Sequence, residues 1–444
     1  MKKILGIIIV LVVLATAFYL LRPQFAKMAY NKARILADST HFEPAIEKYN
    51  TAIKFDDDIP EYYFHRAITF NKLNNTEKAI EDYSKTIELD SLHSQAYFNR
   101  SLIYFDLQQL KESFTGFNNY IRLKPEDPKG FYYLAFIFNT NKLYEEAIQH
   151  YTKAIELDNN YALAYYNRGI TKASTGDFNG SIEDYNKALE LDADNVEIYL
   201  QRVGVKSALE DYKGAIKDYD KIIELNPKNF EAFYKRGYFK LMLKDYHGAV
   251  EDLSKASNLK PNNKEVYFSR GKAYAGIRNY KKALLDYNKY INLNGKTSEV
   301  YYSRGVAKLQ LQMLNEARSD LMQALKQDKT HSKAYWAIGV SYAMQGKYQK
   351  SIDSFDKAIN IDPKLTEAYY NRGVSKGLLN LHNDAIKDYN LAIMQNSKYA
   401  EAYYNRGVSY INLNDFETGC YNFKKARELG MEAANEMIKM YCKE

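Results

Sequence analysis

The chain has 444 residues, of which 46% are hydrophobic and 26% are charged, and it contains two cysteines. This composition excludes a disordered chain, a collagen-like chain and a small disulfide-rich domain. The net charge is +7, but residues 1–35 hold six Lys or Arg and no acid, and the remainder carries 56 basic against 55 acidic side chains. A nearly neutral body lacks the positive field that binds phosphate backbones, so we expect no nucleic-acid partner.

An uncharged, mostly apolar run occupies residues 4–21, between Lys3 and Arg22. As a helix this run would be about 27 Å long, close to the ~30 Å hydrocarbon core of a bilayer. We therefore expect residues 1–25 to be an N-terminal membrane anchor. A signal peptide cleaved after Ala17 is the alternative, because Ala15-Thr16-Ala17 has the small-x-small pattern of a cleavage site. The apolar run continues past that site, which favours the anchor.

Both flanks of the apolar run are basic, so the positive-inside rule does not decide its orientation. A short dibasic start is typical of an export signal, which favours a body outside the cytoplasm, in the periplasm if the source is bacterial. A body that faces the cytoplasm is the alternative.

A period of 34 residues runs through the rest of the chain without an insertion. An arginine recurs at this spacing nine times, with Leu134 and Ile338 in two further places, and an aromatic residue precedes each of the eleven positions by three residues. Each unit has two stretches of helical periodicity around a short turn, such as Thr175-Gly176-Asp177 in residues 162–195. Each unit is therefore expected to be a helical hairpin. Residues 26–59 fit the register as a degenerate first copy.

Small residues mark two positions of the unit, when it is numbered so that the arginine is position seven. Position eight is Gly, Ala or Ser in ten of eleven copies, and position twenty is small in all of them. Because glycine within a helix costs about 1 kcal/mol relative to alanine, these residues need a structural reason. We expect the two helices of the hairpin to approach closely there, with the aromatic residues at position 24 filling the space beside the contact.

This pattern resembles the tetratricopeptide repeat, a helical hairpin of the same length with small residues at positions eight, twenty and 27 and often proline at 32, as at Pro227 and Pro363. The resemblance implies an all-α, right-handed superhelical α-solenoid of about twelve repeats. It would comprise a degenerate first repeat (26–59), eleven repeats (60–433) and a C-terminal capping helix (434–444). Arginine in place of leucine at position seven departs from the pattern, as do the bulky residues at position 27, which are Tyr120, Ile222 and Tyr290.

Most of the arginines have an aspartate sixteen residues later, and the two units that lack the arginine also lack the acid. We expect a structural ion pair between the two helices of a unit, partly desolvated by neighbouring aromatics. An alternative is that each acid meets the arginine of the next unit, but Asp320 would then face Ile338. The predicted pairs are Arg66 and Asp82, Arg168 and Asp184, Arg202 and Asp218, Arg236 and Asp252, Arg270 and Asp286, Arg304 and Asp320, and Arg372 and Asp388.

Signatures of catalysis are missing from the sequence. The seven histidines share no face of the repeat, and no HExxH, paired CxxC, GxGxxG, P-loop or GxSxG motif occurs. Because repeats and flanking segments account for the sequence, we predict no enzyme, no cofactor and no metal, although a chance acid-base pair stays open.

Cys420 and Cys442 could form a disulfide in an exported protein, or could be two small apolar residues in adjacent helices.

The resemblance also implies an inner groove lined by the first helix of each repeat. At positions five and six this groove would present aromatic rings and asparagines, which offer contact area and hydrogen bonds to a peptide backbone. We predict a non-catalytic scaffold that binds a protein or an extended peptide, and glutamates at position two would favour a basic one. Alternatively, the residues at positions five and six are simply the usual residues of this repeat subtype, and the glutamates form an ordinary solvent-exposed face. The predicted groove residues are Phe98, Asn99, Tyr166, Asn167, Tyr234, Tyr302, Trp336, Tyr370, Asn371, Tyr404 and Asn405.

Overall fold

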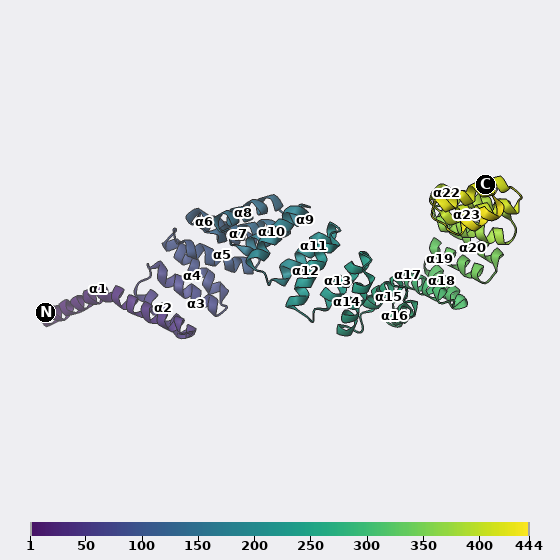
Figure 1. Cartoon of the computed structure of the whole chain (residues 1–444). Coiled ribbons are helices and arrows are strands. Elements are labelled where there is room, and N and C mark those ends of the chain that lie inside the picture. The colour runs from purple at the N-terminus through teal and green to yellow at the C-terminus, as the bar shows by residue number, and fades with distance from the viewer. Residues whose placement is uncertain (1, 443–444) are drawn as a thin grey trace. The chain divides into compact units, whose positions relative to one another are not determined.

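The computed structural model describes residues 2–442, and this part of the chain folds into 25 α-helices without a β-strand (Figure 1). The all-α solenoid expected from the sequence is confirmed. The helices are α1 Lys2–Asp38, α2 Phe42–Phe55, α3 Pro60–Lys72, α4 Thr76–Leu89, α5 Ser94–Asp106, α6 Leu110–Leu123, α7 Pro128–Thr140, α8 Tyr144–Leu157, α9 Ala162–Ser174, α10 Phe178–Leu191, α11 Val196–Ala208, α12 Tyr212–Leu225, α13 Phe230–Met242, α14 Tyr246–Leu259, α15 Lys264–Gly276, α16 Tyr280–Asn292, α17 Ser298–Gln310, α18 Leu314–Gln327, α19 Ser332–Met344, α20 Tyr348–Ile361, α21 Thr366–Leu378, α22 His382–Gln395, α23 Ala400–Asn412, α24 Phe416–Glu428 and α25 Ala434–Tyr441.

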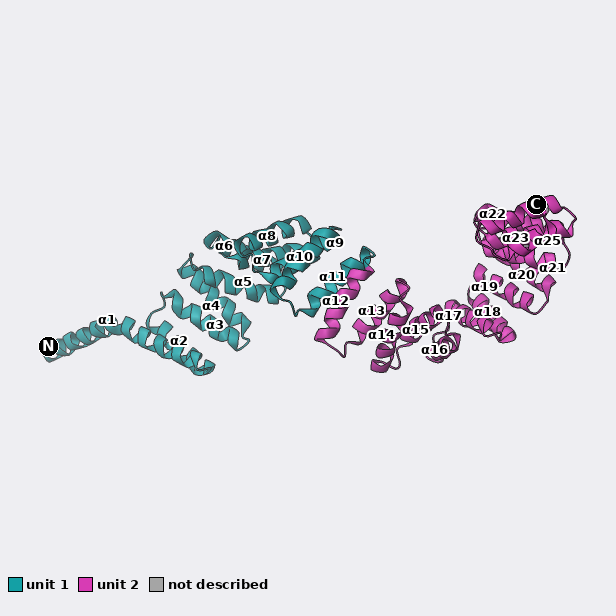
Figure 2. Cartoon of the chain, in the orientation of Figure 1, with its two compact units in different colours: residues 1–211 teal, residues 212–444 magenta. Residues whose placement is uncertain are grey.

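The chain divides into two compact units, which are residues 1–211 and residues 212–444 (Figure 2). Within each unit the helices pack in hairpins, and each hairpin packs on the next. In unit 2 the first helices of successive repeats, α13, α15, α17, α19, α21 and α23, also contact one another in order. These helices therefore form one continuous row, which is the face that the sequence analysis assigned to a partner.

The turn inside each hairpin has the same backbone geometry. The residue at position fifteen is left-handed in all eleven repeats, and only two of these residues, Gly176 and Gly346, are glycine. A left-handed residue after the last turn ends a helix by redirecting the chain. The next residue often caps the second helix, as where Asp177 Oδ1 accepts a hydrogen bond from the Gly180 amide at 2.9 Å. Turn geometry thus follows from position in the repeat more than from residue type.

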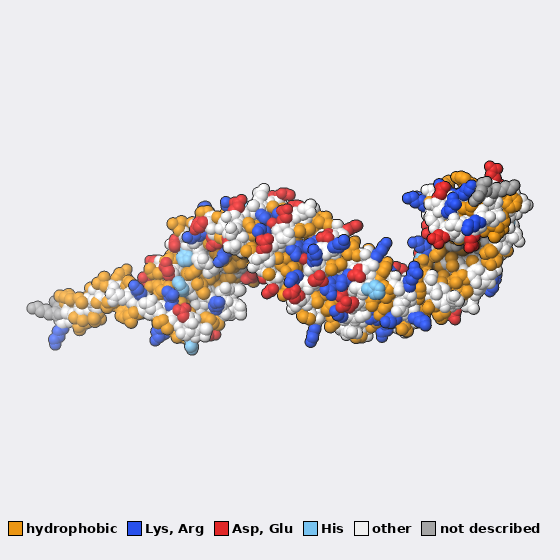
Figure 3. Space-filling model, in the orientation of Figure 1, with side chains coloured by type: hydrophobic (Ala, Val, Ile, Leu, Met, Phe, Trp, Pro, Cys, Tyr) orange, Lys and Arg blue, Asp and Glu red, His pale blue; other side chains and the backbone are white. Residues whose placement is uncertain are grey.

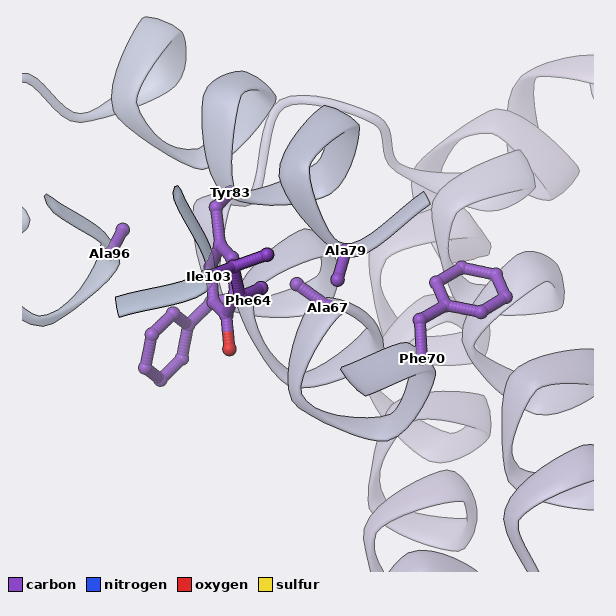
Figure 4. Close-up of a cluster of buried hydrophobic side chains, with 7 residues drawn as sticks. All are labelled: Phe64, Ala67, Phe70, Ala79, Tyr83, Ala96 and Ile103. Atoms are coloured by element: carbon purple, nitrogen blue, oxygen red, sulfur yellow. The ribbon is translucent and has the colours of Figure 1, made fainter. Parts of the chain in front are cut away.

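The core of each hairpin is built on the small residues. Ala67 and Ala79, at positions eight and twenty, point toward each other with no exposed surface, beside the ring of Tyr83 (Figure 4). Where position eight is glycine, the aromatic residue takes up the space: a Cβ added to Gly271 would lie 2.6 Å from Tyr287 Cε1. The expected close contact is therefore confirmed, and its partner is the ring at position 24 as well as the facing backbone.

The first helix joins the apolar N-terminal run to the first repeat. α1 contains one stretch long and apolar enough to cross a membrane, and none of that stretch is buried within the protein. Hydrophobic side chains surround this part of the chain in Figure 3. The same helix continues through Pro23 and packs its later turns on α2, with Ala26 and Ala33 fully buried. The helix has no break between the apolar run and the repeat.

At the other end, α25 packs on α24 through Ala434, which lies in a buried cluster with Phe423 and Ala426. Cys420 of α24 and Cys442, which follows α25, form a disulfide with their Cα atoms 5.5 Å apart. The structure therefore adopts the first of the two alternatives for these cysteines.

Candidate interaction surface

The predicted arginine and aspartate side chains meet in six repeats. In each, the arginine donates from Nε and Nη2 to both carboxylate oxygens of the aspartate of its own repeat, with N···O distances of 2.5–3.0 Å. The aspartates are at most 5% exposed. Such bidentate ion pairs are strong and geometrically specific. The seventh predicted pair, Arg202 and Asp218, has one member in each unit and stays a prediction.

All nine arginines at position seven, including the six above, make another contact, which the sequence analysis missed. Their Nη1 atoms donate to position 25 on the second helix of the preceding repeat, at 2.5–3.3 Å. Each of the six paired arginines therefore joins three helices, and we call this arrangement the arginine clamp. The acceptors are Asn50, Ser84, Thr152, Asn186, Asp220, Ser254, Asn288, Asp356 and Asn390. A signal existed, because position 25 is Met322 before the repeat in which Ile338 replaces the arginine.

A lysine one turn after the arginine adds a second cation to four of the aspartates. Its Nζ lies 2.6–2.9 Å from the aspartate Oδ2 in the pairs Lys172 and Asp184, Lys240 and Asp252, Lys308 and Asp320, and Lys376 and Asp388. Asp82 has no such lysine, because Phe70 stands there and its ring lies under the Arg66 guanidinium. Burial raises the pKa of Asp82 in spite of Arg66. The paired arginine, aspartate and lysine side chains therefore stabilise the repeats and are not part of the surface that would contact a partner.

The repeat of residues 332–365 replaces the clamp with a different arginine. Arg318, on α18 of the preceding repeat, is buried and donates to Ser341 Oγ at 2.6 Å, and its guanidinium lies 4.6 Å from the centre of the Tyr342 ring. Position 21 is aliphatic in most other repeats, so Arg318 is an exception in the sequence as well. Arg318 thus links α18 to α19 by a hydrogen bond, which the aliphatic side chain of Ile338 cannot make.

The aromatic residues predicted for the groove are partly built into the core. Phe98 is 8% exposed and packs on Phe117 and Tyr120, and Tyr370 packs between Tyr389 and Tyr399. Tyr166, Tyr302 and Tyr404 make equivalent contacts, and Tyr234 stacks on Phe230. All except Phe98 keep part of their surface exposed. Most of their area therefore supports the repeats, and the remainder is available to a ligand.

Three of the four predicted asparagines hydrogen-bond to tyrosines of the preceding repeat. The side-chain amides of Asn167 and Asn405 donate to the hydroxyls of Tyr132 and Tyr370, at 3.0 and 2.9 Å, and Asn99 donates to Tyr83 at 3.3 Å. Burial raises the pKa of Tyr132 to about 12, so its hydroxyl stays neutral at physiological pH. An asparagine side chain has further hydrogen-bonding capacity, so part of it remains for a partner.

A recess of about 240 Å³ opens on unit 2 between α17 and α19. It contains Trp336, which is the only tryptophan in the chain and one of the predicted groove residues. The other lining residues were not singled out from the sequence, although valine at position nine in four successive repeats was a signal. The recess is lined by Val306, Leu309, Gln310, Gln312, Trp336, Val340 and Met344. Its lining is mixed, because the amides of Gln310 and Gln312 contribute to it beside the apolar side chains.

The glutamates at position two are all exposed, and they are concentrated in unit 2. Five of the seven lie there, which are Glu231, Glu265, Glu299, Glu367 and Glu401. Glu299 is paired with Lys272, at 2.5 Å, and position two of the repeat that carries Trp336 is Lys333. The free acidic charge along this row of helices therefore lies mainly on either side of the recess.

The repeats and their exposed helix row define a helical scaffold suited to protein-protein interaction. Models described as "Tetratricopeptide repeat" match residues 64–128, 162–195, 264–297, 298–331 and 400–429, and one described as "TPR repeat" matches residues 143–176, 208–241 and 341–380. The chain belongs to the tetratricopeptide repeat family. These proteins are generally non-catalytic scaffolds, and no enzyme family is among the matches.

Several solved structures are similar to this chain. The chain is similar to a tetratricopeptide repeat protein from Parabacteroides merdae, with 21% identity over 56% of this chain and 99% of that one and a TM-score of 0.47. It is also similar to a chain of the Cut9-Hcn1 assembly, with 13% identity over 94% and 96% of the two chains and a TM-score of 0.46. YrrB, described as having an unusual peptide-binding site, is 26% identical over 41% of this chain and 95% of its own, with a TM-score of 0.38. No curated protein matches the sequence.

Proposed function

We propose that this protein is a membrane-tethered scaffold that binds an extended peptide or a protein segment along the first helices of unit 2. The recess around Trp336 carries this proposal. It lies on the helix row of the repeats, it combines apolar side chains with two amides, and its volume suits one aliphatic side chain of a ligand. The partly exposed rings of Tyr302 and Tyr370, in the preceding and following repeats, would extend the contact.

The charges beside the recess favour a basic ligand. Glu367 and Glu401 are exposed at position two of the next two repeats, and Glu231 and Glu265 lie earlier in the row. Acidic charge around an apolar pocket selects a ligand by complementarity and steers its approach. The preferred peptide therefore has one aliphatic residue with lysine or arginine on either side of it. The amides of Gln310 and Gln312 can hydrogen-bond to its backbone.

The disulfide supports a location outside the cytoplasm. Disulfides persist in oxidising compartments and are rare where glutathione and thioredoxin keep thiols reduced. The apolar start of α1 supports a tether in the membrane that bounds such a compartment. A scaffold facing the cytoplasm, with both cysteines reduced, is the competing proposal. Protease and a thiol reagent, neither of which crosses the membrane, distinguish the two when added to cells whose outer envelope has been opened. In the first arrangement the repeats are cut and no free thiol is found after the membrane is dissolved; in the second the repeats are protected and both thiols are free.

Trp336 provides a direct assay of the binding site, since its fluorescence reports only the recess. Synthetic peptides with one leucine between lysines should shift its emission on titration, whereas peptides with serine for leucine or glutamate for lysine should not. Met344→Glu, in the recess, should weaken binding at least tenfold, because a charge placed beside a buried aliphatic side chain costs more than about 1.4 kcal/mol.

Met322→Glu is the matched control for this assay. Met322 and Met344 are 48% and 51% exposed, but Met322 lies on the second helix of its repeat, outside the recess. The control should bind as the unaltered chain does. Equal loss in both variants, or binding unaffected by Met344→Glu, would show that the recess is not the binding site.

A further inference from the structure

The apolar run of α1 ends beside the end of α2, where Arg22 contacts Lys54. The apolar residues of the run 4–21 are exposed, whereas Ala26, one turn after Arg22, is fully buried against α2. No loop separates the two regions, because α1 is one helix from Lys2 to Asp38. Any membrane that holds the apolar run therefore also fixes the height of the first repeat above it.

The end of α2 is placed at that height by three contacts. The Phe55 ring lies beside two rings of α1, with centroid distances of 6.3 Å to Phe18 and 5.8 Å to Phe25. Arg22 Nη2 donates to the Lys54 carbonyl oxygen at 3.2 Å. Residues 18 and 25 are about 10 Å apart along a helix axis, and Leu21, the last apolar residue of the run, lies between them. Phe55 is therefore level with the end of the hydrocarbon-spanning segment.

Two of these rings and a neighbouring one are largely exposed. Phe18 and Phe25 are 54% and 40% exposed, and the neighbouring Tyr19 is 69% exposed. The Arg22 guanidinium lies 5.9 Å from the centre of the Tyr19 ring. Tyrosine beside a basic group, as at Tyr19 and Arg22, is typical of the boundary between lipid tails and headgroups, where the ring is in an apolar medium and the hydroxyl is wet. The wholly apolar phenylalanine rings would lie on the hydrocarbon side of that boundary.

We propose that Phe18, Phe25 and Phe55 form a lipid-binding foot, and that the first repeat rests in the headgroup layer of the bilayer. This inference rests on the membrane tether of the proposed function and adds a second segment, the end of α2, to the membrane contact. Arg22 and Lys54 can bind phosphate groups, while the following Asp57 and Asp58 are exposed and can bind the ammonium groups of the same lipids. This mixture of charges suits a zwitterionic surface better than a strongly anionic one.

The depth of Phe55 can be measured in the full-length protein, reconstituted into phosphatidylcholine vesicles. Trp336→Phe removes the native tryptophan, and Phe55→Trp then places a single probe in the foot. Lipids brominated near the headgroup should quench this probe about twofold, and lipids brominated near the chain ends should quench it less. Phe114→Trp in the same background, on α6 two repeats away and 36% exposed, is the control and should not be quenched.

Phe25→Trp serves as a second probe, on α1 itself, in case the first variant is misfolded. Vesicle flotation and the quenching of the two probes give distinguishable results. Quenching of both probes, with flotation, supports the foot. If the chain floats and only the Phe25→Trp probe is quenched, the tether stands and the proposed role of α2 is wrong. If the chain does not float, both the tether and the foot are wrong.

Discussion

The pair formed by Arg270 and Asp286 allows the arginine clamp to be tested in one repeat, through Asp286→Ala. Asp286 is 5% exposed and accepts two hydrogen bonds of 2.8 Å from Arg270, and no lysine shares it. Its removal leaves the guanidinium with the hydroxyls of Ser254 and Ser257. Breaking a buried pair by removing one partner costs about 3–5 kcal/mol. Because the Arg270 side chain is 16% exposed and can reach water, we expect the lower end, about 3 kcal/mol.

Hydrogen exchange followed by mass spectrometry is the suitable assay, because a long repeat array does not unfold in two states. A loss of about 3 kcal/mol in the free energy of local opening should speed exchange in α15 and α16 about a hundredfold. Exchange in α1 to α10 should not change. An acceleration of less than about twofold would mean that the pair contributes nothing measurable, as for an exposed ion pair.

The sequence itself supplies the control for this experiment. The repeat of residues 332–365 has Ile338 and Ser354 in the places of the arginine and the aspartate. The double variant Arg270→Ile with Asp286→Ser should therefore be more stable than Asp286→Ala alone, by about 1–2 kcal/mol, since no buried charge is left unpaired. A double variant less stable than the single one would refute this account of the clamp.

Three further predictions concern the aromatic core, the C-terminal helix and the exceptional arginine. Burial raises the pKa of Tyr83, Tyr185 and Tyr219 from 10 to about 12, so the folded state favours the neutral phenol and stability should fall as the pH rises from about 10 through 12. Tyrosinate absorbance and circular dichroism should then change together, and titration of all tyrosines near pH 10 without unfolding would contradict this. The double variant Cys420→Ser with Cys442→Ser removes a cross-link between residues 22 apart, and the lost loop-closure constraint should weaken the docking of α25 by about 3 kcal/mol. Limited proteolysis should then cut α25 first, and unchanged resistance to the protease would refute the effect. Arg318→Ala should lower the stability of α19 by about 2 kcal/mol, because hydrogen bonds and the contact with the Tyr342 ring are lost. The loss should appear as faster hydrogen exchange in α19, with α13 as the internal control. Exchange equal to that of the unaltered chain would mean that Arg318 is dispensable.

The repeat fold was accessible from sequence because it depends on local rules applied many times. A small residue such as Ala67 or Gly271 and a ring such as Tyr83 recur at fixed spacing, so one hairpin predicts the others. The hydrogen bonds from each arginine to its own aspartate also correspond to a co-occurrence in the sequence. Its third partner was less visible, since the acceptors at position 25 are chemically varied and share only a short polar side chain.

The candidate site was less predictable than the fold. Sequence alone places Tyr370 and Asn405 on one face, but it does not reveal that their side chains bond to each other and so are partly used within the protein. The recess lies between side chains of α17 and α19, two helices of different repeats, so it depends on how neighbouring repeats pack and not on the pattern within one repeat. The uninterrupted course of α1 through Pro23 was hidden as well, because proline more often ends a helix than continues one.

The arginine clamp also bears on how the protein responds to force. Each clamp couples one hairpin to the one before it, so adjacent hairpins should open as a block and not singly. The coupling is missing at Leu134, where neither the arginine nor its aspartate is present, and at Ile338 it is replaced by Arg318. If the N-terminal helix is held in place while a bound partner pulls on the repeats, the hairpin that carries Leu134 is the expected point of first yielding, and the array would extend there in a defined step.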